Sequence, residues 1–84
     1  MIFSVRIKAS AVKALRRVPK EDRKRLVDAI DRLRESPAAG SSLKGEFSGL
    51  RRLRVGPYRG IYEVMADELV VLVVRIGHRR DVYR

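Results

Sequence analysis

Residues 48–84 read SGLRRLRVGPYRGIYEVMADELVVLVVRIGHRRDVYR, and they specify most of a β-sheet. Their apolar side chains fall into three runs, which are separated by glycine and proline at 56–57 and by the short segment ADE at 66–68. Runs of this length between turn-forming residues are typical of β-strands. The sequence therefore predicts three consecutive strands in an antiparallel meander: residues 50–55, 58–65 and 69–76.

Alternation along the first two predicted strands divides their side chains between the two faces of the sheet. Arg52 and Arg54 share one face of the first strand, and Arg59 and Ile61 share one face of the second. The third strand is apolar without alternation, which is typical of a strand that is covered on both faces. Residues 77–84 follow with one histidine, three arginines and one tyrosine, which we expect at a cleft beyond the strand.

Residues 1–47 are predicted to support this sheet with one strand and two helices. The strand is expected at 3–7, where apolar and polar side chains alternate. The first helix follows an expected N-cap at Ser10. The second helix is expected from Pro19 to about Ser36, because proline suits a helix start and an apolar stripe follows it.

Small and polar residues at 38–42 are typical of a loop. The order of elements is then a strand, a two-helix hairpin and a three-stranded meander. We predict an α+β fold in which a four-stranded sheet carries both helices on one face, and a single domain over residues 1–84. The other face would stay partly open, and arginines on it would suit a nucleic acid.

The composition limits the classes of function. The 84 residues include 20 Lys plus Arg and 10 Asp plus Glu, a formal net charge of +10, which favours a polyanionic partner and most simply nucleic acid. The absence of cysteine excludes disulfides, thiolate metal sites and a catalytic thiol, and we expect no metal or cofactor. No apolar run approaches the ~20 residues of a membrane span. We expect a cytoplasmic protein with no membrane partner.

Three motifs resemble one known family. They are LKG at 43–45, GPYRGIYEV at 56–64 and GHRRDVY at 77–83. Together they resemble the RelE toxins of the RelE/ParE superfamily of type II toxin–antitoxin systems, over nearly the whole chain. The resemblance implies a RelE-like fold, ribosome-dependent cleavage of mRNA in the A site with inhibition of translation, contact with ribosomal RNA, and an acidic antitoxin similar to RelB.

RNA cleavage by attack of a ribose 2′-hydroxyl on the adjacent phosphate explains these residue types. It needs a base for the hydroxyl proton, positive charge on the phosphate oxygens, and an acid for the leaving 5′-oxygen, but no metal. Arginine suits the second task because its planar guanidinium meets two phosphate oxygens and stays charged. The resemblance and this chemistry give Arg59, Arg79, Tyr83 and His78 as candidate catalytic residues of a metal-independent endoribonuclease, and Arg51, Arg52, Arg54 and Arg80 as candidate RNA-binding residues.

Some of these residues have alternative roles. His78 is the best candidate acid or base, since its unperturbed pKa of ~6.5 is near neutrality, but it would equally cap the end of the third strand. Tyr83 is expected to stack on a base or to donate a proton, because a phenol with a pKa of ~10 is a poor base. Arg52 and Arg54 would be ordinary solvated charges if no RNA binds.

Two other functions stay open from the sequence. One is a ParE-like toxin that inhibits gyrase without cutting RNA, and the other is a non-catalytic RNA-binding module. The ribonuclease hypothesis requires Arg52, Arg59 and Arg79 to gather around one phosphate. Coordinates that point them to unrelated sides of the molecule would contradict it.

Overall fold

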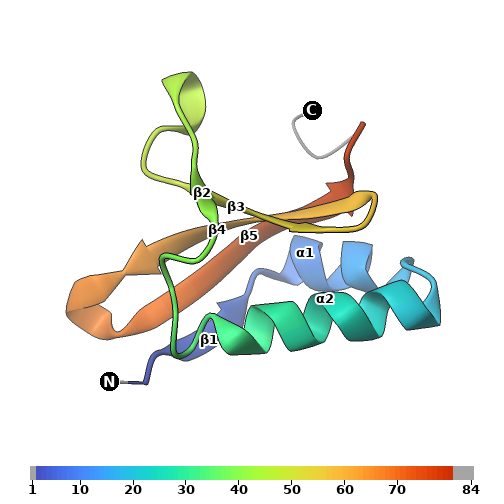
Figure 1. Ribbon diagram of the computed structural model, residues 1–84, viewed down its shortest axis with the longest axis horizontal. Helices are drawn as coiled ribbons and strands as arrows, with labels where there is room; N and C mark the ends of the chain where they lie inside the picture. The colour runs from blue at the N-terminus through green and yellow to red at the C-terminus, as the bar shows by residue number, and fades with distance from the viewer. Residues whose placement is uncertain (1, 81–84) are drawn as a thin grey trace.

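The computed structural model describes residues 2–80 and confirms the α+β class. One layer is a twisted β-sheet, and both helices pack on one of its faces (Figure 1). The elements are β1 (Ser4–Ile7), α1 (Ala9–Arg16), α2 (Lys20–Arg32), β2 (Ser41–Ser42), the 3₁₀ helix η1 (Gly45–Phe47), β3 (Arg51–Val55), β4 (Tyr58–Met65), the 3₁₀ helix η2 (Ala66–Glu68) and β5 (Val70–His78).

The sheet has the strand order β1-β5-β4-β3-β2. β1 is parallel to β5, and every other neighbouring pair is antiparallel, so the predicted meander of β3, β4 and β5 is confirmed. The prediction of four strands is wrong by one. Ser41 and Ser42 pair with β3 and form the short strand β2 inside the predicted loop. Two serines show no hydrophobic alternation, so the sequence carries no signal for this strand.

The helix ends also differ from the prediction. α1 begins at Ala9 with Lys8 in the cap position, so the expected N-cap at Ser10 is wrong. α2 ends at Arg32 rather than near Ser36, and residues 33–35 continue as a turn. A proline at 37 disfavours the helical conformation at Ser36, so it sets an outer limit for the helix, but it does not explain the end at Arg32.

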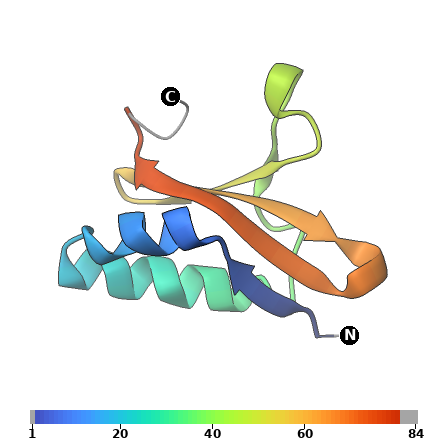
Figure 2. The ribbon, with the colours of Figure 1, turned by 180° about the vertical axis from the view of Figure 1, so that it is seen from behind.

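The hydrophobic core lies between the helices and one face of the sheet (Figure 2). Alternate residues of β4 and β5 supply the sheet side of this core, as strand periodicity requires. We call the other face, which is turned away from α1 and α2, the open face. The largest fully buried core side chains are Leu26 and Leu33 from the α2 region, Tyr62 from β4, and Val71 and Val73 from β5.

A β-bulge in β5 changes which side chains reach the open face. Ile61 on β4 pairs with Arg75. The next residue, Tyr62, pairs with Val73, so Val74 is an extra residue in β5. In a regular strand, residues two apart project to the same face, so without the bulge Arg75 would face the helices like the buried Val73. The bulge instead turns Val74 and Arg75 toward Ile61 on the open face.

Tyr62 anchors the loop between α2 and β3. Its hydroxyl donates a hydrogen bond to the carbonyl oxygen of Pro37 at 2.8 Å and accepts one from the N–H of Gly40 at 2.9 Å. Nη1 of Arg51 donates to the carbonyl oxygen of Gly40 at 2.7 Å. A Cβ at Gly40 would lie 2.6 Å from the Tyr62 hydroxyl and 2.5 Å from the carbonyl oxygen of Arg52, so only glycine fits.

Replacing Tyr62 by phenylalanine should destabilise the fold. The ring still fills the core, but the partly buried backbone groups of Pro37 and Gly40 lose their hydrogen-bond partner. We expect a loss of about 1–3 kcal/mol in the free energy of unfolding, measured by guanidinium denaturation near neutral pH. Tyr58→Phe, on the same face of β4, is the matched control. An equal and small loss in both variants would contradict the anchoring role of Tyr62.

The same hydroxyl should make stability depend on alkaline pH. Burial raises the pKa of the Tyr62 phenol, although the hydrogen bond from Gly40 and the charge of Arg51 oppose the shift. The folded protein therefore holds the phenolic proton more tightly than the unfolded chain, so this stabilisation is present below a pH of ~10 and is lost as pH rises through the folded pKa. We expect the wild-type protein to lose more stability than Tyr62→Phe between about pH 8 and 11. Parallel curves would contradict this.

Candidate nucleic-acid interface

Three neighbouring strands each bring arginine side chains to the open face. Residues that pair directly across two strands project to the same face. Arg54 on β3 pairs with Arg59 on β4. In the next row, Arg52 pairs with Ile61, which in turn pairs with Arg75 on β5. Two adjacent rows of the open face therefore combine Arg52, Arg54, Arg59 and Arg75 from β3, β4 and β5.

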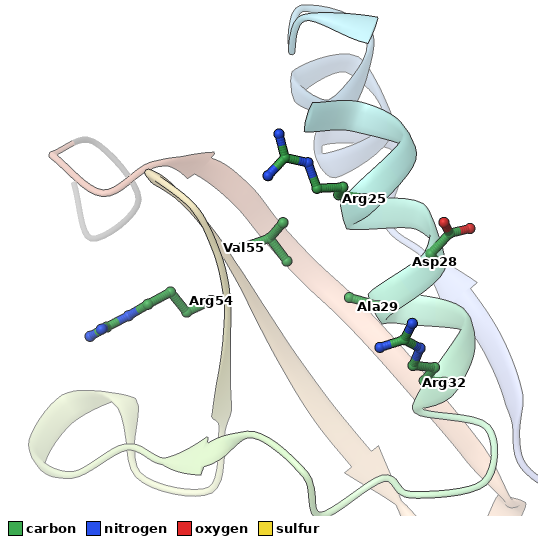
Figure 3. Close-up of a pocket in the computed structure, with 6 residues that line it drawn as sticks. All are labelled: Arg25, Asp28, Ala29, Arg32, Arg54 and Val55. Carbon is green, nitrogen blue, oxygen red and sulfur yellow. The ribbon is translucent and has the colours of Figure 1, made fainter. Parts of the chain in front are cut away.

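The direction of the β3 side chains is visible in Figure 3, where Val55 points toward α2 and Arg54 points to the opposite side of the strand. Arg54 and Arg75 are exposed, whereas Arg52 and Arg59 are half-buried. Nη1 of Arg59 is shielded from solvent. Like charges that lie directly opposite each other in a sheet repel. An anion bound between Arg54 and Arg59 would reduce this repulsion.

Arg51 is not brought together with the other arginines of β3. It pairs with Tyr62, whose side chain lies in the core, so Arg51 is on the helix side of the sheet. There it donates to the carbonyl oxygen of Gly40 and also, at 3.4 Å, to that of Ala38. The structure therefore places Arg51 in the anchor of the loop rather than on the open face.

His78 also lies on the helix side. It pairs with Tyr58, and the two rings meet edge to face with centroids 5.9 Å apart. Both line a cleft of about 310 Å³ against Ala14 and Arg17. His78 lies on the helix side because of the bulge in β5. Regular alternation without the extra residue would place it on the open face. The sheet thus separates the imidazole from the arginine rows.

The segment after β5 starts beside the turn between β3 and β4. The backbone N–H of Arg79 donates to the carbonyl oxygen of Pro57 at 2.8 Å. The N–H of Arg80 donates to Nδ1 of His78 at 3.3 Å, which fits the predicted capping role of His78. Both arginines are exposed. Tyr83 lies outside the described residues 2–80, so its role stays a prediction.

Arg75 is the residue of the open face that sequence reasoning missed. The apolar run of β5 indicated burial on both faces, and regular alternation would place position 75 among the core residues. The one signal is a cation inside the run VVLVVRI at 70–76, which a strand buried throughout would not tolerate. Such a cation indicates either that its face of the strand is open or that alternation is broken locally, and here a β-bulge breaks it.

Positive charge continues around the edge of β3 toward α2. A cleft of about 320 Å³ lies between this edge and the helix (Figure 3). Arg25 and Arg32 enter it from α2, and Arg25 is 3.5 Å from the carboxylate of Asp22. The remaining lining residues are Asp28, Ala29, Arg54 and Val55. The cleft therefore combines three arginines, one carboxylate and two apolar side chains, and both α2 and β3 contribute cations and apolar groups.

Residues 2–80 contain no group of three or more His, Asp or Glu side chains that would hold a metal ion. None of the helices in this part of the chain is long and apolar enough to cross a membrane.

Comparison with known proteins identifies the family. A family model described as "ParE toxin of type II toxin-antitoxin system, parDE" matches residues 5–83. The chain is also 30% identical over 86 residues to Toxin RelG of Mycobacterium tuberculosis, and the match covers 100% of this chain and 99% of that protein. The chain therefore belongs to the ParE toxin family of type II toxin–antitoxin systems.

Solved structures support the same grouping. The toxin–antitoxin complex RelBE2 from Mycobacterium tuberculosis matches with a TM-score of 0.85 and 27% identity, over 94% of this chain and 100% of that one. The archaeal RelE–RelB complex from Pyrococcus horikoshii OT3 matches with a TM-score of 0.82 and 30% identity, over 98% and 100%. The resemblance to RelE toxins of the RelE/ParE superfamily is thus confirmed.

Proposed function

We propose that this toxin is a RelE-type endoribonuclease that cleaves mRNA in the ribosomal A site and so inhibits translation. The observation that carries the proposal is the direct pairing of Arg54 with Arg59 on the open face, with Arg52 one row away. Both helices lie on the other face, so they do not block an extended RNA strand from this row, in which Arg54 is exposed and Arg59 is half-buried. The fold is the one found in RelE proteins.

The arginines supply positive charge where the reaction develops negative charge. In this proposal Arg54 and Arg59 hold the scissile phosphate, since two planar guanidiniums stabilise the charge of a five-coordinate phosphorus. Arg52 holds a neighbouring phosphate, because residues two apart on a strand are about 7 Å apart. Arg79 joins them from the segment beside Pro57. The proposal thus retains Arg59 and Arg79 as the predicted phosphate clamp, adds Arg54 to it, and moves Arg52 from that phosphate to the next.

The described residues account less well for the proton transfers of this reaction than for the stabilisation of its negative charge. His78 faces the helices, so its position favours a positioning role through its hydrogen bond with Arg80 over direct contact with RNA. The ribosome would then supply much of the rate acceleration by aligning the 2′-hydroxyl with the phosphate. Correct placement of two reacting groups lowers the activation free energy by up to about 7–11 kcal/mol. Tyr83 remains the proposed stacking or proton-donating residue.

Replacing Arg59 by alanine should abolish most cleavage. We expect the rate of A-site cleavage to fall by about 10²- to 10³-fold, as when one group that stabilises transition-state charge is removed. The measurement is mapping of mRNA ends after purified toxin is added to translating ribosomes. Arg16→Ala, an exposed residue at the end of α1, removes the same charge far from the open face. Equal losses in both variants would show a general charge effect and contradict the assignment.

A second candidate function is inhibition of DNA gyrase without RNA cleavage. The description of the matching family model as a ParE toxin favours it. A supercoiling assay run beside the ribosome assay separates the two functions. Gyrase inhibition with intact mRNA would establish the second and overturn the first. Salt-dependent RNA binding with neither activity would instead establish the non-catalytic RNA-binding module.

We also propose that an acidic antitoxin of RelB type is the partner. The formal net charge of +10 favours an acidic ligand, and the similar structures named above are toxin–antitoxin complexes. A groove of about 210 Å³ at the rim of the sheet, between β1 and α2, offers a contact surface. Its apolar lining includes Val5, Ile7 and Val27, and Val27 is 44% exposed.

Val27→Asp should weaken antitoxin binding by about 10-fold or more, because a carboxylate in an apolar contact costs at least about 1.4 kcal/mol. The measurement is calorimetric titration of the purified toxin with the antitoxin that co-purifies from its host. Ala38→Asp, an exposed loop position, is the control of equal charge. Unchanged affinity in Val27→Asp would move the contact surface away from this groove.

A further inference from the structure

A small pocket on the open face lies beside the arginine rows. It has a volume of about 130 Å³. η1 stands on the side of the sheet opposite to the helices and forms one wall (Figure 1). The end of β1, the middle of β4 and the bulge of β5 form the rest. The lining residues are Lys8, Phe47, Leu50, Ile61, Val74 and Arg75.

The floor of this pocket is Ile61, which is 1% exposed although it faces away from the core. Phe47 and Leu50 belong to the segment that covers it, and both are half-buried. Hydrogen bonds from Leu43 N to Leu50 O at 3.0 Å and from Leu50 N to Phe47 O at 3.1 Å close this segment into a defined loop. Gly45 provides a positive φ of 70° that the loop requires. The aromatic wall is therefore held in place by the backbone.

The size of the pocket selects its occupant. Sites for ordinary small molecules have volumes of about 300–1,000 Å³, so this pocket is too small for a ligand of that size. A cavity of about 150 Å³ lined by apolar side chains holds one benzene ring. The pocket is slightly smaller than that cavity, so its volume is comparable to one planar ring at most, with Phe47 and Ile61 placed to contact it.

Positive charge at the rim of the pocket indicates which class of ligand it would bind. Lys8 and Arg75 are both exposed and flank the apolar floor. An aromatic wall with an apolar floor and cations at the rim is the arrangement by which proteins bind unpaired nucleotides, with the base stacked and the phosphates paired. The β-bulge matters here, because it aims both Val74 and Arg75 at this pocket. A purely apolar protein side chain would not need the two cations.

We propose that this pocket binds the base of one unpaired RNA nucleotide, with Lys8 and Arg75 contacting its flanking phosphates. The inference rests on the proposed function in one respect, that RNA is what the open face binds. Arg75 shares a row with Arg52, and the next row contains Arg54 and Arg59. The bound nucleotide therefore neighbours the one whose phosphate lies between Arg54 and Arg59, and the shape of the pocket contributes to the choice of cleavage sequence.

The test is equilibrium binding of short single-stranded RNA to the free protein, without ribosomes. Each oligonucleotide is compared with one of equal length and charge in which one position is abasic. The wild-type protein should bind the base-bearing RNA about 5- to 100-fold more tightly, as one stacked base contributes. Phe47→Ala should lose this preference and Phe47→Tyr should keep it. Arg75→Gln should reduce the slope of the logarithm of the RNA-binding constant against the logarithm of salt concentration by about one, because one phosphate contact is lost.

The outcomes separate this inference from the proposed function. Equal binding of base-bearing and abasic RNA by the wild-type protein would contradict the proposal that the pocket binds a base. This measurement uses only the wild-type protein, so it does not depend on whether a variant folds. A preference that persists in Phe47→Ala would move the base to another site. Unchanged RNA binding in Phe47→Ala together with weaker antitoxin binding would assign the pocket to the antitoxin instead. In each of these cases cleavage on the ribosome, measured separately, would still decide the proposed function.

Discussion

Strict side-chain alternation along β4 organises both faces of this toxin. β4 is the middle strand of the sheet, and it places Tyr58, Tyr62 and Val64 against the helices while Arg59 and Ile61 face outward. The same residues that complete the core thus fix the direction of the cations. Tyr62 adds a second constraint, because its hydroxyl ties the preceding loop to the sheet. The packing of the core and the direction of the open-face arginines therefore depend on one strand.

The bulge in β5 is the main departure from this regularity. One extra residue sends Arg75 to the open face and His78 to the helix side. The open face thereby gains a cation and loses the imidazole. This exchange is consistent with a protein whose open face binds phosphates and whose chemistry depends on alignment by a larger partner. It also gives Val74 a place in the wall of the small pocket.

The sequence predicted the fold class, the meander and the common face of Arg52, Arg54 and Arg59, because alternation in β3 and β4 is regular. It could not predict β2, since Ser41 and Ser42 show no pattern. The apolar run of β5 concealed the position of the bulge, because the cation at 75 was its only signal, and the face of His78 depends on that bulge. The role of Arg51 was equally hidden, because it depends on a contact with Gly40 that lies far away in the chain.

The chemistry of the cut ends gives the sharpest test of the proposed reaction. Purified toxin is added to ribosomes stalled at a known codon, and both mRNA fragments are analysed. Attack by the 2′-hydroxyl predicts a 2′,3′-cyclic phosphate, or the monophosphate formed by its hydrolysis, on the upstream fragment and a 5′-hydroxyl on the downstream fragment, within the A-site codon. Intact mRNA, or fragments with a 3′-hydroxyl and a 5′-phosphate, would contradict the account.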